Sequence, residues 1–263
     1  MKRVAAIAVV LAVVAVGFFV VGRIGWNYLQ RHRTVDPSTA LDKQCDDVPE
    51  GATRLTLTAD DDTVLGAVLV GPEDATVGVV LRQGASQTIC EWLPWAGEVA
   101  ADTGAKVLLF DRRGRGSSPA DGNLSAEPGD TLVAIRELRD SGVDEVAMVA
   151  SSMGNSIMFS TVPTVQPPPC AVVSISPVLT SSDGHGVVDG SRLEGLPDSV
   201  WVTWEEGNPS VADNAQRIVA RAADQGLPPV HELSIDTTDH SRQLVLNHPE
   251  AASFVTDAIA SCG

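Results

Sequence analysis

Short apolar runs alternate with longer segments of helical periodicity along most of the chain. Strands are predicted at 53–58, 63–70, 76–82, 106–110, 145–150, 171–176, 200–204 and 230–235. Helices are predicted at 91–102, 130–141, 153–161, 211–223 and 249–260. Because short buried strands that alternate with helices are typical of βαβ units, we expect one α/β domain. Its sheet should be doubly wound and mostly parallel, with eight strands of which the first two are antiparallel.

The N-terminus has a different pattern, with 18 residues from Val4 to Val21 that carry no charge. A helix of this length covers about 27 Å, close to the thickness of a bilayer core. We therefore expect residues 1–25 to form a membrane anchor, with a cleaved signal sequence as the alternative. Residues 26–50 end in a polar stretch with two prolines and are predicted to be a linker to a domain at 51–263.

The net negative charge of the chain limits the kinds of molecule that it can bind. All 34 acidic residues follow Thr34, whereas only 13 of the 18 lysines and arginines do, so the rest of the chain has a net charge of −21. Such a surface repels the phosphate backbone, and we expect no nucleic-acid partner. Contact with a membrane is expected only through the N-terminal helix.

The cysteines indicate in which cellular compartment the protein is located. They form an even set without zinc-like spacing, Cys45, Cys90, Cys170 and Cys262. In an oxidising compartment they would form two disulfides, for which three connectivities exist, whereas four free thiols would fit the cytoplasm. We expect Cys45 to pair with Cys90 and Cys170 with Cys262. We therefore expect a membrane-anchored protein with an extracytoplasmic domain, or alternatively a secreted one.

The run VAMVASSMGN, residues 146–155, brings two serines directly after a predicted strand and before a predicted helix. Ala150, Ser152 and Gly154 fit the nucleophile elbow G-x-S-x-G, with alanine in the first glycine position. Open α/β sheets carry their active sites at the carboxyl ends of strands, so Ser152 is a candidate nucleophile. The alternative interpretation is a serine-rich helix cap at an ordinary turn.

Several segments together resemble the α/β-hydrolase family, from about Thr53 to the C-terminus. The resemblance is to its lidless serine hydrolases, similar to dienelactone hydrolases and esterases. It rests on VGVVLRQGASQTICEW, GAKVLLFDRRGRGSSP, VAMVASSMGN, VWVTWEEGNPSVADNAQRI and DTTDHSRQLVLNHPE. These resemble, in order, the family's oxyanion turn, its D-x-R-G-x-G-x-S segment, its elbow, its acid loop and its histidine loop.

The resemblance implies roles for individual residues. Ser152 would attack an acyl carbon after His240 takes its proton. The backbone N–H groups of Met153 and Ala85 would hold the resulting oxyanion. Asp111, in the D-x-R-G-x-G-x-S segment, is expected to shape a turn and to take no part in the chemistry.

The acid is where the chain departs from the family pattern, because the position of the acid falls on Asn208. An amide stabilises a forming imidazolium less well than a carboxylate does. Glu206 is our first choice as a substitute, and Glu205 in the same loop and Asp183 after the sixth strand are further candidates.

The expected function is hydrolysis of a small ester or thioester, of the carboxylesterase or thioesterase type, without a metal or other cofactor. About 20 residues separate the sixth and seventh predicted strands, too few for a helical lid, so the pocket should be open to a small acyl substrate. A catalytically silent α/β-hydrolase-fold protein that binds a partner at the cell surface is the main alternative, and a peptidase is a third.

Overall fold

The structure is a computed structural model that describes residues 34–263. The predicted anchor at 1–25 lies outside the described residues. Within 34–263, no helix combines the length and the apolar character needed to cross a bilayer.

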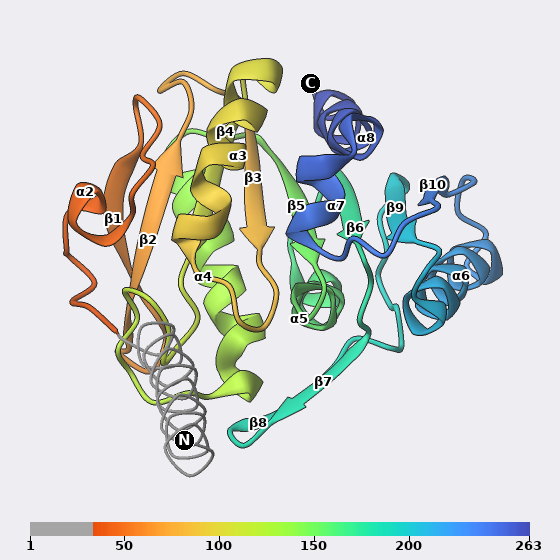
Figure 1. The fold of residues 1–263 in the computed structure, drawn as a ribbon, viewed down its shortest axis with the longest axis horizontal. Coiled ribbons are helices and arrows are strands. Elements are labelled where there is room, and N and C mark those ends of the chain that lie inside the picture. Colours follow the sequence, from red (N-terminus) through yellow and green to blue (C-terminus); the bar gives the residue numbers. More distant parts are fainter. Residues whose placement is uncertain (1–33) are drawn as a thin grey trace, which may run out of the picture.

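A sheet of eight strands forms the centre of the domain, in the order β1-β2-β4-β3-β5-β6-β9-β10 (Figure 1). Strand β2 runs antiparallel to its neighbours β1 and β4, and the other neighbours pair in parallel. The predicted sheet of eight strands, mostly parallel and with the first two antiparallel, is therefore confirmed. The strands are β1 (Thr53–Thr58), β2 (Val64–Val70), β3 (Val77–Arg82), β4 (Lys106–Phe110), β5 (Glu145–Ser151), β6 (Ala171–Ile175), β9 (Val200–Glu205) and β10 (His231–Ile235).

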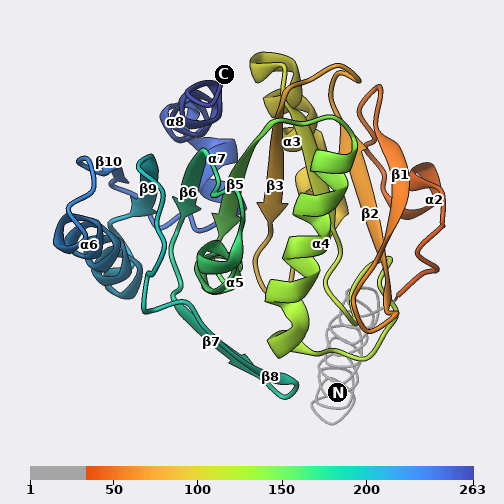
Figure 2. The ribbon, with the colours of Figure 1, turned by 180° about the vertical axis from the view of Figure 1, so that it is seen from behind.

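Helices cover both faces of this sheet (Figures 1 and 2). One face packs against α3 (Ile89–Thr103), α7 (Arg242–Asn247) and α8 (Pro249–Ala260), and the other against α4 (Glu127–Asp140), α5 (Gly154–Thr161) and α6 (Pro209–Asp224). Successive side chains of a strand point to opposite faces. In β3, Val79 and Leu81 accordingly join the core under α3, and Val80 joins the core under α4. An apolar run without alternation is what a strand buried on both faces requires.

A hairpin that the sequence patterns did not predict lies between β6 and β9. It consists of β7 (Thr180–Asp183) and β8 (Gly186–Asp189), and it extends past α5 at the end of the molecule toward which the parallel strands point (Figure 1). Val188 of the hairpin packs in a small apolar cluster with Leu124, Met153 and Ile157. The described residues between β6 and β9 thus form a hairpin and no helical lid.

Residues 34–50, predicted as part of a linker, pack against the domain. Leu41 in the short helix α2 (Leu41–Gln44) and Cys45 are both buried in the core under α3. The Gln44 side chain donates a hydrogen bond of 2.9 Å to Asp111. A disulfide joins Cys45 to Cys90 in the first turn of α3. This stretch is therefore part of the folded domain and not a free tether.

The second disulfide joins Cys170 to Cys262, so both predicted pairings are confirmed. Cys170 directly precedes β6, and its backbone N–H donates to Val146 at the start of β5. The Cys170–Cys262 bridge therefore lies at the amino ends of the parallel strands.

Candidate active site

The turn between β5 and α5 has the geometry of a nucleophile elbow. Ser152 has a φ of +52°, which is unusual for a residue with a side chain, and its backbone N–H donates to Ile175 of β6 at 3.0 Å. A Cβ atom at Gly154 would lie 2.3 Å from the carbonyl oxygen of Arg82, so only glycine lets α5 begin this close to β3. The sharp turn leaves Ser152 partly exposed between buried neighbours.

His240 and Glu205 complete a continuous hydrogen-bonded chain with this serine. The Oγ atom of Ser152 is 2.9 Å from Nε2 of His240, and Nδ1 of the same ring is 2.6 Å from Oε1 of Glu205. The Glu205 side chain is fully buried, whereas that of His240 is 37% exposed. Nucleophile, base and carboxylate are thus brought together from three separate segments, in the chain order Ser, acid, His.

The carboxylate at His240 is neither of the two residues selected from the sequence. Glu206 points the other way, where its Oε1 accepts a hydrogen bond of 2.7 Å from the exposed Ser234. Asn208 directly precedes α6, and its amide nitrogen lies 3.5 Å from Oε1 of Glu205, at the limit of a hydrogen bond. Glu205 and Glu206 point in opposite directions because consecutive side chains along an extended strand turn to opposite faces.

Burial along β9 does not separate the two glutamates, because residues of both parities, such as Thr203 and Trp204, are buried. The signal that favours Glu205 is its place as the last residue of β9, at the carboxyl end of a strand, where open α/β sheets carry their sites. The other sequence candidate, Asp183, lies in the hairpin, where its carboxylate is 3.4 Å from Arg112. Sequence reasoning included Glu205 but did not rank it first.

The loops that carry the acid and the base are in direct contact. Gly207, after β9, donates its N–H to Thr237 at 2.9 Å, and a Cβ atom at Gly207 would lie 2.5 Å from the same carbonyl oxygen. Asp239, next to the base, accepts hydrogen bonds from Asn247 at 2.9 Å and from His248 at 3.1 Å. These bonds hold the pKa of Asp239 below its usual value. The loop that carries the base is therefore fixed on both sides.

The turn after β3 presents backbone donors beside the nucleophile. A Cβ atom at Gly84 would be 3.4 Å from that of Ser152, so the turn abuts the elbow. The Gly84 carbonyl accepts from the backbone N–H of Gln87, and in a trans peptide the N–H of Ala85 must point the opposite way. Within residues 34–263, neither the N–H of Ala85 nor that of Met153 donates to another protein group. Both are free to face an oxyanion.

A buried cluster of charges supports this turn. Arg112 donates to the carbonyl oxygen of Ala85 at 3.1 Å, and it contacts Glu127 at 3.3 Å. Glu127 also forms an ion pair with Arg82. Burial raises the pKa of Glu127, although both guanidinium groups act in the opposite direction. Since the cluster is buried and paired, it holds the turn more rigidly than surface charges would.

Gln83 directly follows β3, at the start of this turn. Its side chain is fully buried, and its amide nitrogen donates to the carbonyl oxygen of Phe110 at 2.7 Å. The residue therefore ties the end of β3 to the end of β4, and it leaves the backbone donors of the turn in place.

Asp111 has the structural role expected of it. Its buried carboxylate accepts hydrogen bonds from the backbone N–H of Ile89 at 2.8 Å and from that of Ser117 at 2.7 Å. Burial raises the pKa of Asp111, against the effect of these bonds. It thereby fixes the start of α3 relative to the loop after β4, and it takes no part in the contacts of Ser152 and His240.

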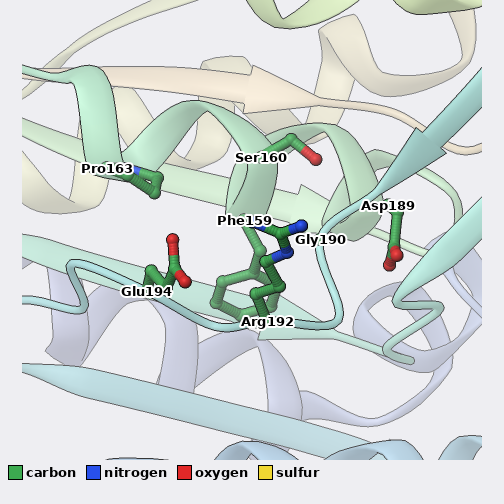
Figure 3. Close-up of a pocket in the computed structure, with 7 residues that line it drawn as sticks. All are labelled: Phe159, Ser160, Pro163, Asp189, Gly190, Arg192 and Glu194. Atoms are coloured by element: carbon green, nitrogen blue, oxygen red, sulfur yellow. The ribbon is translucent and has the colours of Figure 1, made fainter.

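Beyond Ser152 and His240, the described residues hold a cavity but no cluster of candidate metal ligands. Among the described residues, no group of three or more His, Cys, Asp and Glu side chains is placed to hold a metal ion. A cavity of about 340 Å³ lies between the end of α5 and the segment after β8, with Ser160 and Pro163 on one side and Asp189, Arg192 and Glu194 on the other (Figure 3). It contains neither the nucleophile nor the base.

The sheet order, the elbow before α5 and the segments that bring Ser152, Glu205 and His240 together define the class of the protein: it has the α/β-hydrolase fold. No protein-family model and no curated relative matches the sequence. Solved structures do match.

Three of the similar structures are an esterase, the protein EstE5 and a hormone-sensitive lipase. The esterase Pf2001 of Pyrococcus furiosus has a TM-score of 0.68 at 15% identity, over 86% of this chain and 97% of that one. EstE5, soaked with p-nitrophenyl butyrate, has a TM-score of 0.63 at 15% identity, over 90% and 97%. A hormone-sensitive lipase from a metagenome library has a TM-score of 0.63 at 15% identity, over 85% and 91%. At this identity, the likeness establishes the fold.

Proposed function

We propose that the protein is a serine hydrolase that cleaves a small ester or thioester, with Ser152 as nucleophile, His240 as base and Glu205 as acid. The observation that carries the proposal is the unbroken chain of hydrogen bonds from Ser152 Oγ through the imidazole to Glu205. The esterase names of the similar structures support the same chemistry. No cofactor is required for it.

In the proposed reaction, Ser152 Oγ attacks the acyl carbon while its proton moves to Nε2 of His240. The N–H groups of Met153 and Ala85 hold the oxyanion, and Glu205 stabilises the imidazolium. Collapse of the intermediate breaks the bond to the leaving alcohol or thiol, which takes the proton from Nε2. Water then attacks the acyl-enzyme with the same proton transfers and releases the carboxylic acid. The short hairpin between β6 and β9 favours small, accessible acyl groups over long chains.

A fluorophosphonate probe tests this proposal, because it labels only an activated serine. We expect the wild type to be labelled and to hydrolyse p-nitrophenyl acetate, and Ser152→Ala to do neither. Ser160→Ala is a matched control, since its hydroxyl lies in α5, the helix that follows Ser152, and donates to the backbone carbonyl of Ser156. If the wild type is neither labelled nor active, the protein is a silent binding protein with this fold. If Ser152→Ala is labelled like the wild type, the nucleophile is a different residue.

We also propose that residues 1–25 anchor the domain in a membrane with the domain outside the cytoplasm. The uncharged run from Val4 to Val21 and the two disulfides of the domain support this proposal. The full-length protein should sediment with membranes, and protease added to intact cells should remove the domain. A domain that stays protected until the cells are lysed would contradict the orientation, and a protein in the culture medium would indicate a cleaved signal sequence.

A further inference from the structure

Ser176 lies directly after β6, fully buried beside the acid of the site. Its Oγ atom is 2.6 Å from Oε2 of Glu205 and 2.9 Å from the backbone nitrogen of Ser241. Ser241 is the residue that follows His240. One hydroxyl group therefore touches both the carboxylate and the loop that carries the base.

The direction of each hydrogen bond follows from the atoms available. A backbone N–H only donates, so Ser241 donates to Ser176 Oγ, and the single proton of that hydroxyl is left for Glu205. The other oxygen of the carboxylate, Oε1, faces Nδ1 of His240. An ionised carboxylate only accepts, so Nδ1 carries the proton of the ring. Nε2 is then the unprotonated nitrogen, and it can accept the proton of Ser152.

The backbone of Ser176 indicates that its hydroxyl has a role of its own. Its φ is +47°, in the left-handed region that glycine adopts far more easily than serine. Its N–H donates at 2.9 Å to Thr203 of β9, the strand that ends in Glu205. Backbone conformation alone would favour glycine here. The contacts made by the hydroxyl are what a glycine would lose.

We propose that Ser176 is a positioning residue: its hydroxyl holds the carboxylate of Glu205 oriented toward His240, and it fixes the base loop relative to the acid. The inference rests on the proposed hydrolase function. It assigns no direct contact with substrate to Ser176, which acts only through Glu205 and the backbone of Ser241.

Two substitutions with different effects on the backbone test the role. Ser176→Gly removes the hydroxyl and relieves the left-handed conformation, whereas Ser176→Ala removes the hydroxyl and keeps the unfavourable conformation. Hydrolysis of p-nitrophenyl acetate should lose about ten- to a hundredfold in kcat in both variants, with KM unchanged, because a hydrogen bond to a charged group is lost. The glycine variant should nevertheless melt at the higher temperature of the two.

A double-mutant cycle with Glu205→Gln separates positioning from a general structural defect. If Ser176 acts through the carboxylate, Ser176→Gly should lower the residual rate by less than twofold in the Glu205→Gln background. Ser174→Ala is the matched control. This serine lies two residues earlier, within β6, and is fully buried. Its hydroxyl has no partner among the described residues, so kcat should stay at the wild-type value.

The outcomes distinguish this inference from the proposed function. A wild type without hydrolysis overturns the function and, with it, the inference. A wild type that is active, together with a Ser176→Gly variant of equal kcat, overturns the inference alone. An equal loss in the wild-type and Glu205→Gln backgrounds also overturns it, because the hydroxyl would then act independently of the acid.

Discussion

Glu205 stands next to a second glutamate in the chain, yet the two side chains have opposite surroundings. Glu205 is buried against His240 and Ser176, and Glu206 is exposed beside Ser234. Burying a carboxylate is costly unless both of its oxygens have hydrogen-bond donors. The hydroxyl of Ser176 provides the donor for Oε2.

Replacing each of the two glutamates in turn should show which one is the acid. We expect Glu205→Gln to lower kcat on p-nitrophenyl acetate by about 10²–10⁴, because the amide no longer stabilises the imidazolium or selects its tautomer. Glu206→Gln, the matched control one residue later, should stay within about twofold of the wild type. Steady-state kinetics would contradict the assignment if Glu206→Gln gave the larger loss.

A charge at residue 208 should slow the proposed hydrolysis instead of restoring a missing acid. The Asn208 amide nitrogen lies 3.5 Å from Glu205 Oε1, so Asn208→Asp would face one carboxylate with another. Like charges at this separation favour protonation of one of the two, which weakens the hold on His240. We expect kcat to fall about three- to tenfold at neutral pH. An increase in kcat would mean that Glu205 does not act as the acid.

Among the elements, the carboxylate of Asp239 joins the parts of the segment from β10 to α8. Asp239 accepts hydrogen bonds from Asn247, the last residue of α7, and from His248 at the start of α8. It thereby joins the loop that carries His240 to two helices on one face of the sheet. Local opening of this segment would move the base away from Ser152.

The contribution of Asp239 to stability should depend on pH in the acid range. The hydrogen bonds from Asn247 and His248 hold its pKa in the folded state below the unfolded value, so the ionised form is stabilised by folding. This stabilisation is complete above the unfolded value, near 4, and it is lost as the pH falls through the folded pKa. The melting temperature of Asp239→Asn should therefore lie below that of the wild type at pH 6, and the two should converge toward pH 2. A difference that stays constant from pH 6 to pH 2 would contradict the role of the charge.

Across the whole molecule, the two disulfides hold opposite ends of the sheet. Cys170–Cys262 joins segments 92 residues apart at the amino ends of the strands. Cys45–Cys90 fixes the packed segment before β1 to the first turn of α3. That turn follows directly on the oxyanion turn at Gly84 and Ala85.

Removal of either disulfide should lower the stability of the domain, but only the removal of Cys45–Cys90 should also lower kcat. We expect Cys170→Ser with Cys262→Ser to lower the free energy of unfolding by about 2–4 kcal/mol and to leave kcat unchanged. Cys45→Ser with Cys90→Ser should lower kcat as well. This disulfide fixes the start of α3, which follows the turn that presents the N–H of Ala85. Urea unfolding and steady-state kinetics on both double variants check this contrast. A loss of kcat in the first variant would show that the amino ends of the strands are coupled to the site.

The order of strands and helices, the elbow and the nucleophile–base pair could be predicted from the chain alone. Apolar runs of strand length and helical periodicity are local properties of the sequence. They predict the observed elements because the strands are buried on both faces and the helices are buried on one. Ser152 was identifiable because the tight turn requires a glycine at position 154, and this glycine can be recognised in the sequence two residues after the serine. His240 was identifiable because few histidines lie at the carboxyl end of a predicted strand. The disulfide pairing followed from the positions of the cysteines relative to these elements.

Only the tertiary structure decided which carboxylate meets the imidazole. Glu205, Glu206 and Asn208 lie within four residues of one another, and the choice depends on the face of β9 that receives a loop 35 residues later. The β7–β8 hairpin and the packing of residues 34–50 were likewise decided by contacts between distant segments. The chain determines its elements through interactions between near neighbours. The site is completed by hydrogen bonds across the sheet, whose partners no local pattern specifies.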